Sequence, residues 1–322
     1  MIIFRIFRSD AVTLRRNPYK TGIMKKSFLV LLILAGILLP ESPASGKTVR
    51  RQLSILPGSV PETETLAQET MEFVYDYRCC IDTTDTLGDN ISSDLMLLQT
   101  AAAGLSKFSS YKNLAVDSLI MSSSHEQITD AAIEGKLSTG EFMTIYKNYP
   151  AAGKLTHTEK ICQDWFRYEE ELPRFEWELT DSVTDILGYA CQSAKCSFRG
   201  REWTVFYTEE IPLSEGPWKL HGLPGLIMKA SDAKGHYSFE CIGIRSKADR
   251  AVTLYKVPFN KVSRKDYYNT RHRYEVNPYA YFEATTGGNI TITDEAGNPV
   301  PDAFDPMELP FEYIERDWNK TE

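Results

Sequence analysis

The side chains that could carry chemistry are five histidines, two runs of carboxylates and one arginine pair. The histidines do not have the spacing of a metal site, and they are His125, His157, His221, His236 and His272. No Gly-x-Ser-x-Gly turn and no glycine-rich phosphate loop occurs. The acidic runs Glu169–Glu171 and Glu209–Glu210 could supply an acid/base pair, but a solvated strand end explains them more simply. We therefore assign no catalytic residue, no metal site and no cofactor.

Two other polar features have both a functional and a simpler interpretation. Arg199 and Arg201 flank Gly200 and could present two cations to an anionic ligand. A hairpin turn at Gly200 with solvated charges on either side is the simpler interpretation. His221 could line a pocket, but we expect a histidine in a surface turn.

The most unusual stretch of the chain is the hexapeptide Gly-Leu-Pro-Gly-Leu-Ile, which follows a Gly-Pro-Trp triplet. The residues of the two motifs are Gly216, Pro217, Trp218, Gly222, Leu223, Pro224, Gly225, Leu226 and Ile227. Proline at the second position and glycine at the third predict a type II turn over residues 223–226, with a positive φ at Gly225. The apolar residues that follow predict a buried strand. We interpret this block as structural, with a binding edge as the alternative.

The first 46 residues have the pattern of a leader. Met24-Lys25-Lys26 is a short basic start, and Phe28 to Leu39 is an unbroken run of apolar or small residues. Small residues near position 46 suit cleavage, so residues 24–46 are expected to be a signal peptide and residues 1–23 an over-extended gene start. The run is short for a permanent span, so we expect export to the periplasm or cell surface with no membrane span after cleavage.

All six cysteines lie beyond this leader, and they are Cys79, Cys80, Cys162, Cys191, Cys196 and Cys241. An oxidising compartment allows disulfides among them, although free buried thiols remain the alternative and the sequence cannot give a pairing. The neighbours Cys79 and Cys80 should point to opposite faces of a strand. The spacing of Cys191 and Cys196 is unusual for zinc, which disfavours a metal site.

The composition is that of a folded, acidic protein. Hydrophobic residues make up 42% of the chain and aromatic residues 11%, and the aromatic share favours strands. Without the leader, which carries seven basic and two acidic residues, the formal net charge changes from −8 to −13. This charge argues against nucleic acid or an anionic membrane surface as a partner.

Short strand patterns follow one another closely along residues 66–260. Alternating burial is expected around Met71 to Tyr77, and residues 112–135 could be helical or irregular. Further strands are predicted over residues 141–146, 154–161, 164–168, 175–179, 186–192, 202–207, 225–230, 237–244 and 289–293. A helix capped by Ser263 is predicted over residues 264–275. The intervals are too short for crossover helices, so one mainly β domain over residues 47–322 with an antiparallel meander sheet is expected.

Residues 185–244 resemble the GLPGLI family of exported Bacteroidetes proteins. The resemblance runs through ILGYAC at Ile186, FRGR at Phe198, YTEEIP at Tyr207, GPWKL at Gly216 and the hexapeptide itself. It implies an exported, mostly β protein without an assigned activity, with a family core at about 66–260. Its sheet is similar to the curved open half-barrel or bowl of periplasmic lipoprotein carriers, or to an accessory domain of bacterial glycosidases. No catalytic residues can be carried over.

Three functions fit these observations. The first is non-catalytic binding of a lipid, a peptide or an envelope protein on a concave sheet, because aromatic strands occur without a catalytic constellation. The second is a carboxylate-dependent hydrolase, which a facing pair of buried carboxylates would favour. The third is a structural component of a surface assembly. The sequence does not identify the ligand or the oligomeric state.

Overall fold

The structure is a computed structural model that describes residues 60–84, 90–124, 127–128, 140–246, 250–287, 306 and 308–319. Residues Ile55–Glu322 form one compact unit. The expected gene start, signal peptide and strand over residues 289–293 lie outside the described residues. No described helix has the length and apolar character needed to cross a membrane.

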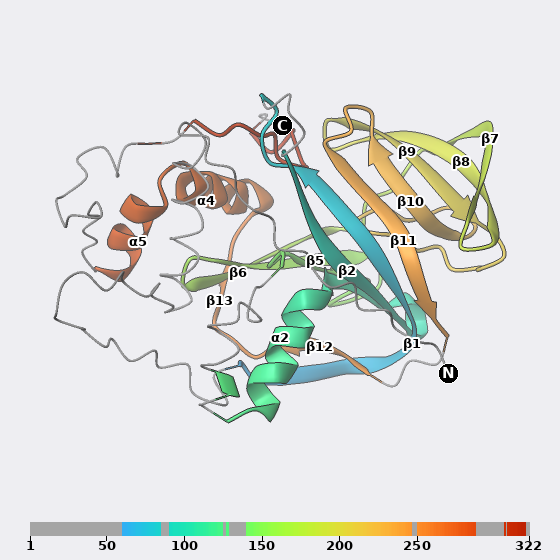
Figure 1. Cartoon of the computed structure of the whole chain (residues 1–322). Coiled ribbons are helices and arrows are strands. Elements are labelled where there is room, and N and C mark those ends of the chain that lie inside the picture. Colours follow the sequence, from blue (N-terminus) through green and yellow to red (C-terminus); the bar gives the residue numbers. More distant parts are fainter. Residues whose placement is uncertain are drawn as a thin grey trace. The chain divides into compact units, whose positions relative to one another are not determined.

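The described residues form a mainly β fold built on one large open sheet, as Figure 1 shows. The first group of strands is β1 (Thr63–Cys80), β2 (Ile91–Ala101), β3 (Ser106–Ser110), β4 (Thr144–Lys147), β5 (Lys154–Ile161) and β6 (Asp164–Glu171). The second group is β7 (Glu178–Ile186), β8 (Tyr189–Phe198), β9 (Arg201–Thr208), β10 (Leu226–Asp232) and β11 (Tyr237–Arg245). Two short strands follow, β12 (Ala251–Tyr255) and β13 (Phe259–Lys261). The strand order is β13-β6-β5-β4-β3-β2-β1-β11-β10-β9-β8-β7, and β12 pairs with β1.

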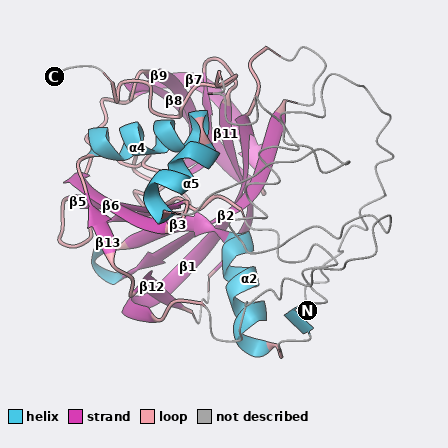
Figure 2. Ribbon diagram, turned by 90° about the vertical axis from the view of Figure 1, so that its left-hand side faces the viewer, coloured by secondary structure: helices cyan, strands magenta, loops and turns pink. Residues whose placement is uncertain are grey.

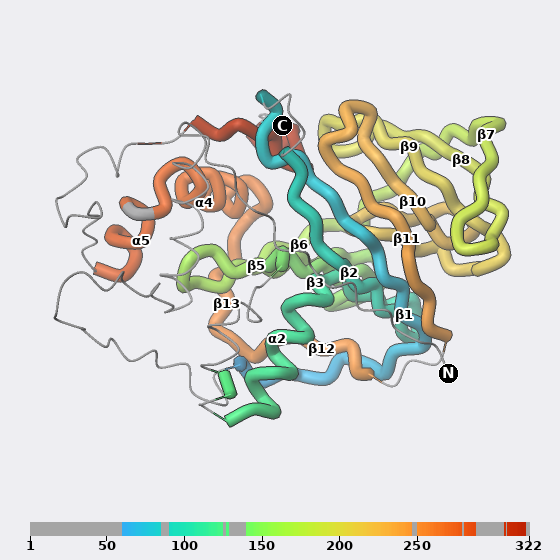
Figure 3. The backbone as a smooth tube through the Cα atoms, in the orientation of Figure 1, coloured from blue at the N-terminus to red at the C-terminus, as the bar shows by residue number. Residues whose placement is uncertain are grey.

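The long strand β1 joins two antiparallel meanders, and its course is clear in the tube of Figure 3. On one edge β1 pairs with β2; on the other it pairs first with β12 and then with β11. Phe73, Tyr75 and Tyr77 are buried on one face of this strand, in agreement with the alternation in the sequence. The prediction of a mainly β antiparallel meander is therefore confirmed, with one parallel pair, β13 with β6, as the exception.

Three α-helices with bounds within the described residues accompany the sheet: α2 (Tyr111–Ser122), α4 (Arg264–Val276) and α5 (Pro278–Thr286). A short 3₁₀ turn, η1 (Ala102–Gly104), links β2 to β3. The predicted helix is confirmed as α4, and the Ser263 side chain accepts a hydrogen bond from the Asp266 backbone N–H at its start. Figure 2 shows α4 next to α5, with α2 apart from both. α4 packs on β6, and α2 packs on β2 and β3.

The apolar core lies in two clusters. The larger one joins the middle strands of both meanders and includes Phe108, Trp203, Trp218 and Phe239. The smaller one lies beneath α4, where Tyr267 and Tyr268 of the helix pack against Phe166 and Tyr168 of β6 and against Tyr313. Aromatic side chains thus fill the core between α4 and one face of β5 and β6. The opposite face of these two strands is not part of this smaller cluster.

Candidate ligand-binding site

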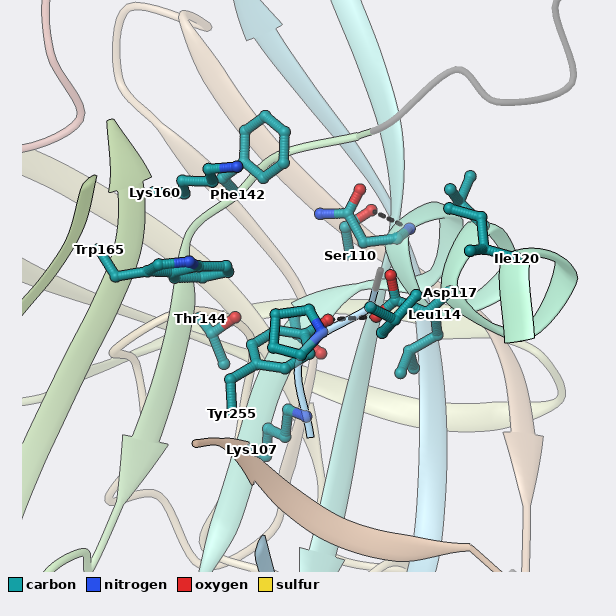
Figure 4. Close-up of a pocket in the computed structure, with 15 residues that line it drawn as sticks. Lys107, Ser110, Leu114, Asp117, Ile120, Phe142, Thr144, Lys160, Trp165 and Tyr255 are labelled. Atoms are coloured by element: carbon teal, nitrogen blue, oxygen red, sulfur yellow. Dashed lines mark hydrogen bonds between the residues drawn. The ribbon is translucent and has the colours of Figure 1, made fainter. Parts of the chain in front are cut away.

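A cavity of about 210 Å³ lies between the sheet, β12 and α2. Side chains from β3 and β4, β5 and β6, the helix α2 and the strand β12 line it, as Figure 4 shows, together with Phe142 of the loop before β4 and with Val60 and Pro61 before β1. They include Lys107, Ser109, Leu114, Asp117, Ile120, Phe142, Thr144, Lys160, Trp165 and Tyr255. The cavity therefore has both polar side chains and aromatic or aliphatic ones in its lining.

Strand periodicity places the polar floor of the cavity. In β3, Lys107 and Ser109 point to the cavity, while Phe108 between them points into the main core. Cross-strand pairing puts Tyr146 of β4 opposite Lys107, so the two side chains lie on the same face. Lys107 and Ser109 are each only 6% exposed, so this strand carries a buried amine and a buried hydroxyl side by side.

The Lys107 amine is poorly compensated. Its Nζ donates one long hydrogen bond of 3.4 Å to Thr253 Oγ1, and no ion pair joins it to a carboxylate among the described residues. Burial lowers the pKa of Lys107 to about 8, and the charge of Asp117 opposes this effect only in part. The Ser109 Oγ is buried and has no hydrogen-bond partner within the described part of the chain. Two buried polar groups therefore face the cavity with unused hydrogen-bonding capacity.

Asp117 on α2 has its own hydrogen-bond partner. The Tyr255 hydroxyl donates a hydrogen bond to the Asp117 carboxylate. Burial raises the pKa of Asp117, although this hydrogen bond and the Lys107 charge act in the opposite direction. The Asp117–Tyr255 contact links α2 to β12 and forms one side of the cavity, as the dashed line in Figure 4 indicates.

The other side of the cavity is aromatic. The Trp165 ring of β6 lies 5.1 Å from the Tyr255 ring of β12, and the Lys160 Nζ lies 6.0 Å from the Trp165 ring. These strands meet because the chain from β12 to β13 runs from the edge of β1 to the edge of β6, where β13 pairs. The Tyr146 hydroxyl donates a 2.8 Å hydrogen bond to the Thr253 carbonyl oxygen and fixes β12 over this face.

The predicted motif lies elsewhere, and its turn differs from the expectation. Gly225 does not have a positive φ, so the type II turn is wrong; the positive φ of 99° belongs to Gly222. Gly225 is needed for a different reason. A Cβ at this position would lie 1.9 Å from the Thr208 carbonyl oxygen, so only glycine allows β10 to start this close to the end of β9.

The remaining motif residues have packing roles. Trp218, Leu223, Leu226 and Ile227 are all buried in the main core. The buried Lys147 donates hydrogen bonds of 2.8 and 3.0 Å to the carbonyl oxygens of Gly216 and Leu220, which fixes the loop between them. The expected buried strand after the hexapeptide is β10.

The predicted hairpin at Gly200 joins β8 to β9, but the charges beside it are not solvated. Arg201 has a side chain only 1% exposed, and its Nη1 lies 2.8 Å from an Asp232 carboxylate oxygen. Its other nitrogens donate to the carbonyl oxygens of Tyr313 and Ile314. Arg199 pairs with Glu170, Glu315 and Asp317. These arginines bind the C-terminal segment of the chain rather than a ligand.

The acidic run and His221 also differ from the simple interpretation. Glu170 is mostly buried and pairs with Lys219, a fully buried side chain that also pairs with Glu315 at 2.6 Å. Glu169 and Glu171 are exposed, as expected for a strand end. His221 is partly buried rather than at the surface, with its ring 5.3 Å from Phe175, and burial lowers its pKa to about 4.

All six cysteines are free and buried in the structure, the second of the two alternatives that the sequence leaves open. Cys79 and Cys80 end β1 as neighbours, and both are buried. Burial raises the pKa of Cys79 and of Cys241 to about 12, which makes these thiols inert near neutral pH. Within the described ranges, no three His, Cys, Asp or Glu side chains are grouped to hold a metal ion.

The sequence analysis does not identify the cavity residues. The available signal in β3 is the alternation of Lys107 and Ser109 with the apolar Phe108. That signal places the two polar side chains on one face of a strand, but it does not show which residues cover them. Trp165 and Tyr255 are far from β3 in the sequence, and only the fold brings them to the same cavity.

Comparison with known proteins supports a limited relationship. Residues 199–229 match a family model described as a protein of unknown function, Porph_ging, which points to a Bacteroidetes-type family over this short stretch. No curated protein matches the chain. A structure of PNGF-II in space group P21 is similar with a TM-score of 0.43 and 15% identity over 62% of this chain and 32% of that chain. A second PNGF-II structure, in space group C2, gives a TM-score of 0.43 and 16% identity over 63% and 32% of the two chains. The chain thus spans about a third of the PNGF-II chain, and its matched family stretch is the block from Arg199 to Lys229 that packs the core and holds the C-terminal segment.

Proposed function

We propose that this chain is a non-catalytic binding protein that holds part of an apolar small molecule in the cavity beneath α2. The observation that carries the proposal is the pair of buried polar groups, Lys107 and Ser109, on one face of β3 in a cavity that also has aromatic and aliphatic walls. The Ser109 hydroxyl has no hydrogen-bond partner among the described residues, and Lys107 Nζ has one long hydrogen bond of 3.4 Å. Ligand sites typically combine such apolar walls with a few polar groups that fix orientation.

The size of the cavity limits what it can hold. A dry cavity of roughly 150 Å³ accepts benzene, so a cavity of about 210 Å³ accepts a group only somewhat larger. Sites for whole drug-sized ligands are about 300–1,000 Å³. The cavity therefore suits one end of a longer apolar molecule, with the remainder outside.

We further infer that the chain is a member of the GLPGLI family and is exported to the periplasm or cell surface. The hexapeptide, the Gly-Pro-Trp loop and the leader pattern support this inference. An acidic exported protein with an apolar cavity suits the transport or retention of a lipid-like molecule in the envelope.

The test is to purify the protein natively from an envelope fraction and identify bound small molecules by mass spectrometry. A matched pair of variants on α2 distinguishes binding in the cavity from binding elsewhere on the protein. Leu114→Trp fills the cavity, whereas Ala115→Trp adds the same side chain at an exposed position next to it.

We expect a bound apolar molecule in the wild type and in Ala115→Trp, and its loss in Leu114→Trp. Equal recovery from both variants would place the ligand elsewhere. A wild-type protein that is consistently free of ligand, and that binds no apolar probe in vitro, would contradict the proposal.

A second candidate, the carboxylate-dependent hydrolase, is favoured by one observation. Burial raises the pKa of Glu141 to about 7. Glu159 is also buried, but Arg271 and hydrogen bonds from His157 and Tyr267 outweigh that burial and lower its pKa to about 2. Two carboxyl groups whose pKa values are shifted in opposite directions can act as an acid and a base. Hydrolysis of chromogenic glycosides or esters that disappears in Glu141→Gln would favour this function; no turnover would rule it out for those substrates.

A further inference from the structure

Resting on the proposed function, we infer that the ligand of the α2 cavity is an aliphatic monocarboxylate whose head binds Lys107 and Ser109. Both residues stand on the same face of β3, two positions apart, so their polar atoms open to the same part of the cavity. A carboxylate has two oxygens, one for the Lys107 ammonium and one for the Ser109 hydroxyl. One such group would give the Ser109 hydroxyl a hydrogen-bond partner and would give the Lys107 ammonium a charged partner in addition to Thr253.

The charge of the site favours a single negative charge. Among the described lining residues the cations are Lys107, beside Ser109, and Lys160, whose ammonium lies over the Trp165 ring. Asp117 faces the same cavity and opposes a second negative charge. No arginine is among the described residues that line the cavity, and a phosphate head is usually held by several cationic or backbone donors. A carboxylate fits this balance better than a phosphate dianion.

The walls favour an aliphatic tail over a peptide. Leu114 and Ile120 of α2 and Phe142 line the cavity beside the polar floor. The backbone of β3 is already paired on both edges, with β2 and with β4. The Asn113 side chain is also occupied, because it bonds to the Glu141 carbonyl oxygen and the Gly140 N–H. The amides of a bound peptide would find few partners here, whereas a hydrocarbon chain needs none.

Asp117 of α2, Tyr146 of β4 and Thr253 of β12 interact with the Lys107 amine. The other titratable groups that line the cavity are Lys160 of β5 and Tyr255 of β12. The Tyr255 hydroxyl is engaged with Asp117, and burial keeps Tyr146 un-ionised by raising its pKa. A bound carboxylate would stabilise the charged Lys107 amine, so its affinity should fall as the pH rises above about 8, the pKa of the free site.

The experiment is isothermal titration of the full chain with sodium octanoate, 1-octanol and octylamine, which share a tail and differ in the head. We expect octanoate to bind at least about tenfold more tightly than octanol, since a hydrogen bond to a charged group is worth this much. Octylamine should bind more weakly than both. The octanoate affinity should fall at least about fivefold between pH 6.5 and pH 9.5, while the octanol affinity stays constant.

Variants separate the head group from the tail. Lys107→Met keeps the length of the side chain and removes the amine, and Ser109→Ala removes the hydroxyl. Each should remove the preference for octanoate over octanol, completely for Lys107→Met and in part for Ser109→Ala. Lys154→Met is the control, because Lys154 is an exposed strand lysine paired with Glu171 outside the cavity. Binding of octanol by each variant shows that the cavity is intact.

The outcomes distinguish the two proposals. Wild-type protein that binds octanol and octanoate equally, or a preference for octanoate that survives Lys107→Met, would overturn the carboxylate inference and leave the binding function standing. Binding of an amidated and a free-acid hydrophobic tripeptide in preference to octanoate would replace the aliphatic tail with a peptide. Wild-type protein that binds none of these probes would overturn the proposed function as well.

Discussion

At the residue scale, Gly225 shows how a correct motif can have an unexpected physical cause. The sequence indicates a glycine with positive φ, but the chain needs the absence of a side chain instead, because the Thr208 carbonyl oxygen occupies the place of a Cβ. The pattern of proline followed by glycine cannot distinguish these two causes. The requirement for glycine at position 225 depends on a contact that is formed only when β9 and β10 pair.

We predict that Gly225→Ala lowers the free energy of unfolding by more than about 2 kcal/mol, because backbone atoms would have to move to admit the methyl group. Gly243→Ala is the matched control. That strand glycine has no positive φ, and its Cβ would make an ordinary contact of 3.7 Å with Val74. Urea unfolding of both variants measures the difference. Equal, small effects would show that β10 can move away from Thr208.

Glu141 gives a prediction about pH. Its pKa rises to about 7 mainly because burial disfavours the charged form. The folded state therefore loses stability as the pH rises from about 4.5, the ordinary pKa of a glutamate, to about 7. Glu141→Gln should abolish this loss. The free energy of unfolding of Glu141→Gln minus that of the wild type should be larger at pH 8 than at pH 5 by more than about 1 kcal/mol.

The measurement is urea unfolding of Glu141→Gln across this pH range, with Glu209→Gln as an exposed control. Glu209→Gln should leave the pH profile of the wild type unchanged. A Glu141→Gln profile that keeps the wild-type decline would show that Glu141 ionises freely in the folded protein.

At the element scale, the C-terminal segment 308–319 is attached to the sheet by the hairpin of β8 and β9. Arg201 pairs with Asp232 and donates to two carbonyl oxygens of this segment, while Arg199, Lys219 and Arg264 surround the fully buried Glu315. Arg199, Arg201 and Lys219 of the matched family stretch therefore hold a segment about 110 residues further along the chain.

We predict that Arg201→Met costs about 3–5 kcal/mol of unfolding free energy, because the buried Asp232 would lose its charged partner. Limited proteolysis should then cut within residues 308–319 sooner than in the wild type. Arg78→Met is the control, since the Arg78–Asp76 pair is exposed and worth less than about 1 kcal/mol. An unchanged proteolysis pattern in Arg201→Met would mean that the other ion pairs hold the segment alone.

The elements themselves were largely predictable from periodicity and turn signals. β5 and α4 agree with the expected ranges because each has a clear period and a clear start. The predicted position of the β7–β8 hairpin was wrong, because residues 186–192 were expected to form one continuous strand. In the structure Leu187 and Gly188 form the turn, both with positive φ. A leucine gives no sequence signal for that conformation.

At the scale of the whole molecule, the cavity depends on contacts that join distant parts of the chain. Lys107, Trp165 and Tyr255 meet only because the chain after β11 returns along β1 and then reaches β6. No single-strand pattern contains this return, so the mainly β meander could be predicted from the sequence and the candidate site could not. Burial of Lys107 with a single long hydrogen bond is likewise a property of the assembled fold.

The most direct test of the cavity as a ligand site uses Trp165, which lines it, as a fluorescent reporter. Bromine quenches an indole ring that it contacts, so 8-bromooctanoate should quench the tryptophan fluorescence of the wild type in a saturable way. The saturable part should disappear in Trp165→Phe and persist in Trp177→Phe, whose indole instead donates a hydrogen bond to the His221 carbonyl oxygen. Saturable quenching that is equal in Trp165→Phe and the wild type, or that is absent from the wild type, would contradict this assignment.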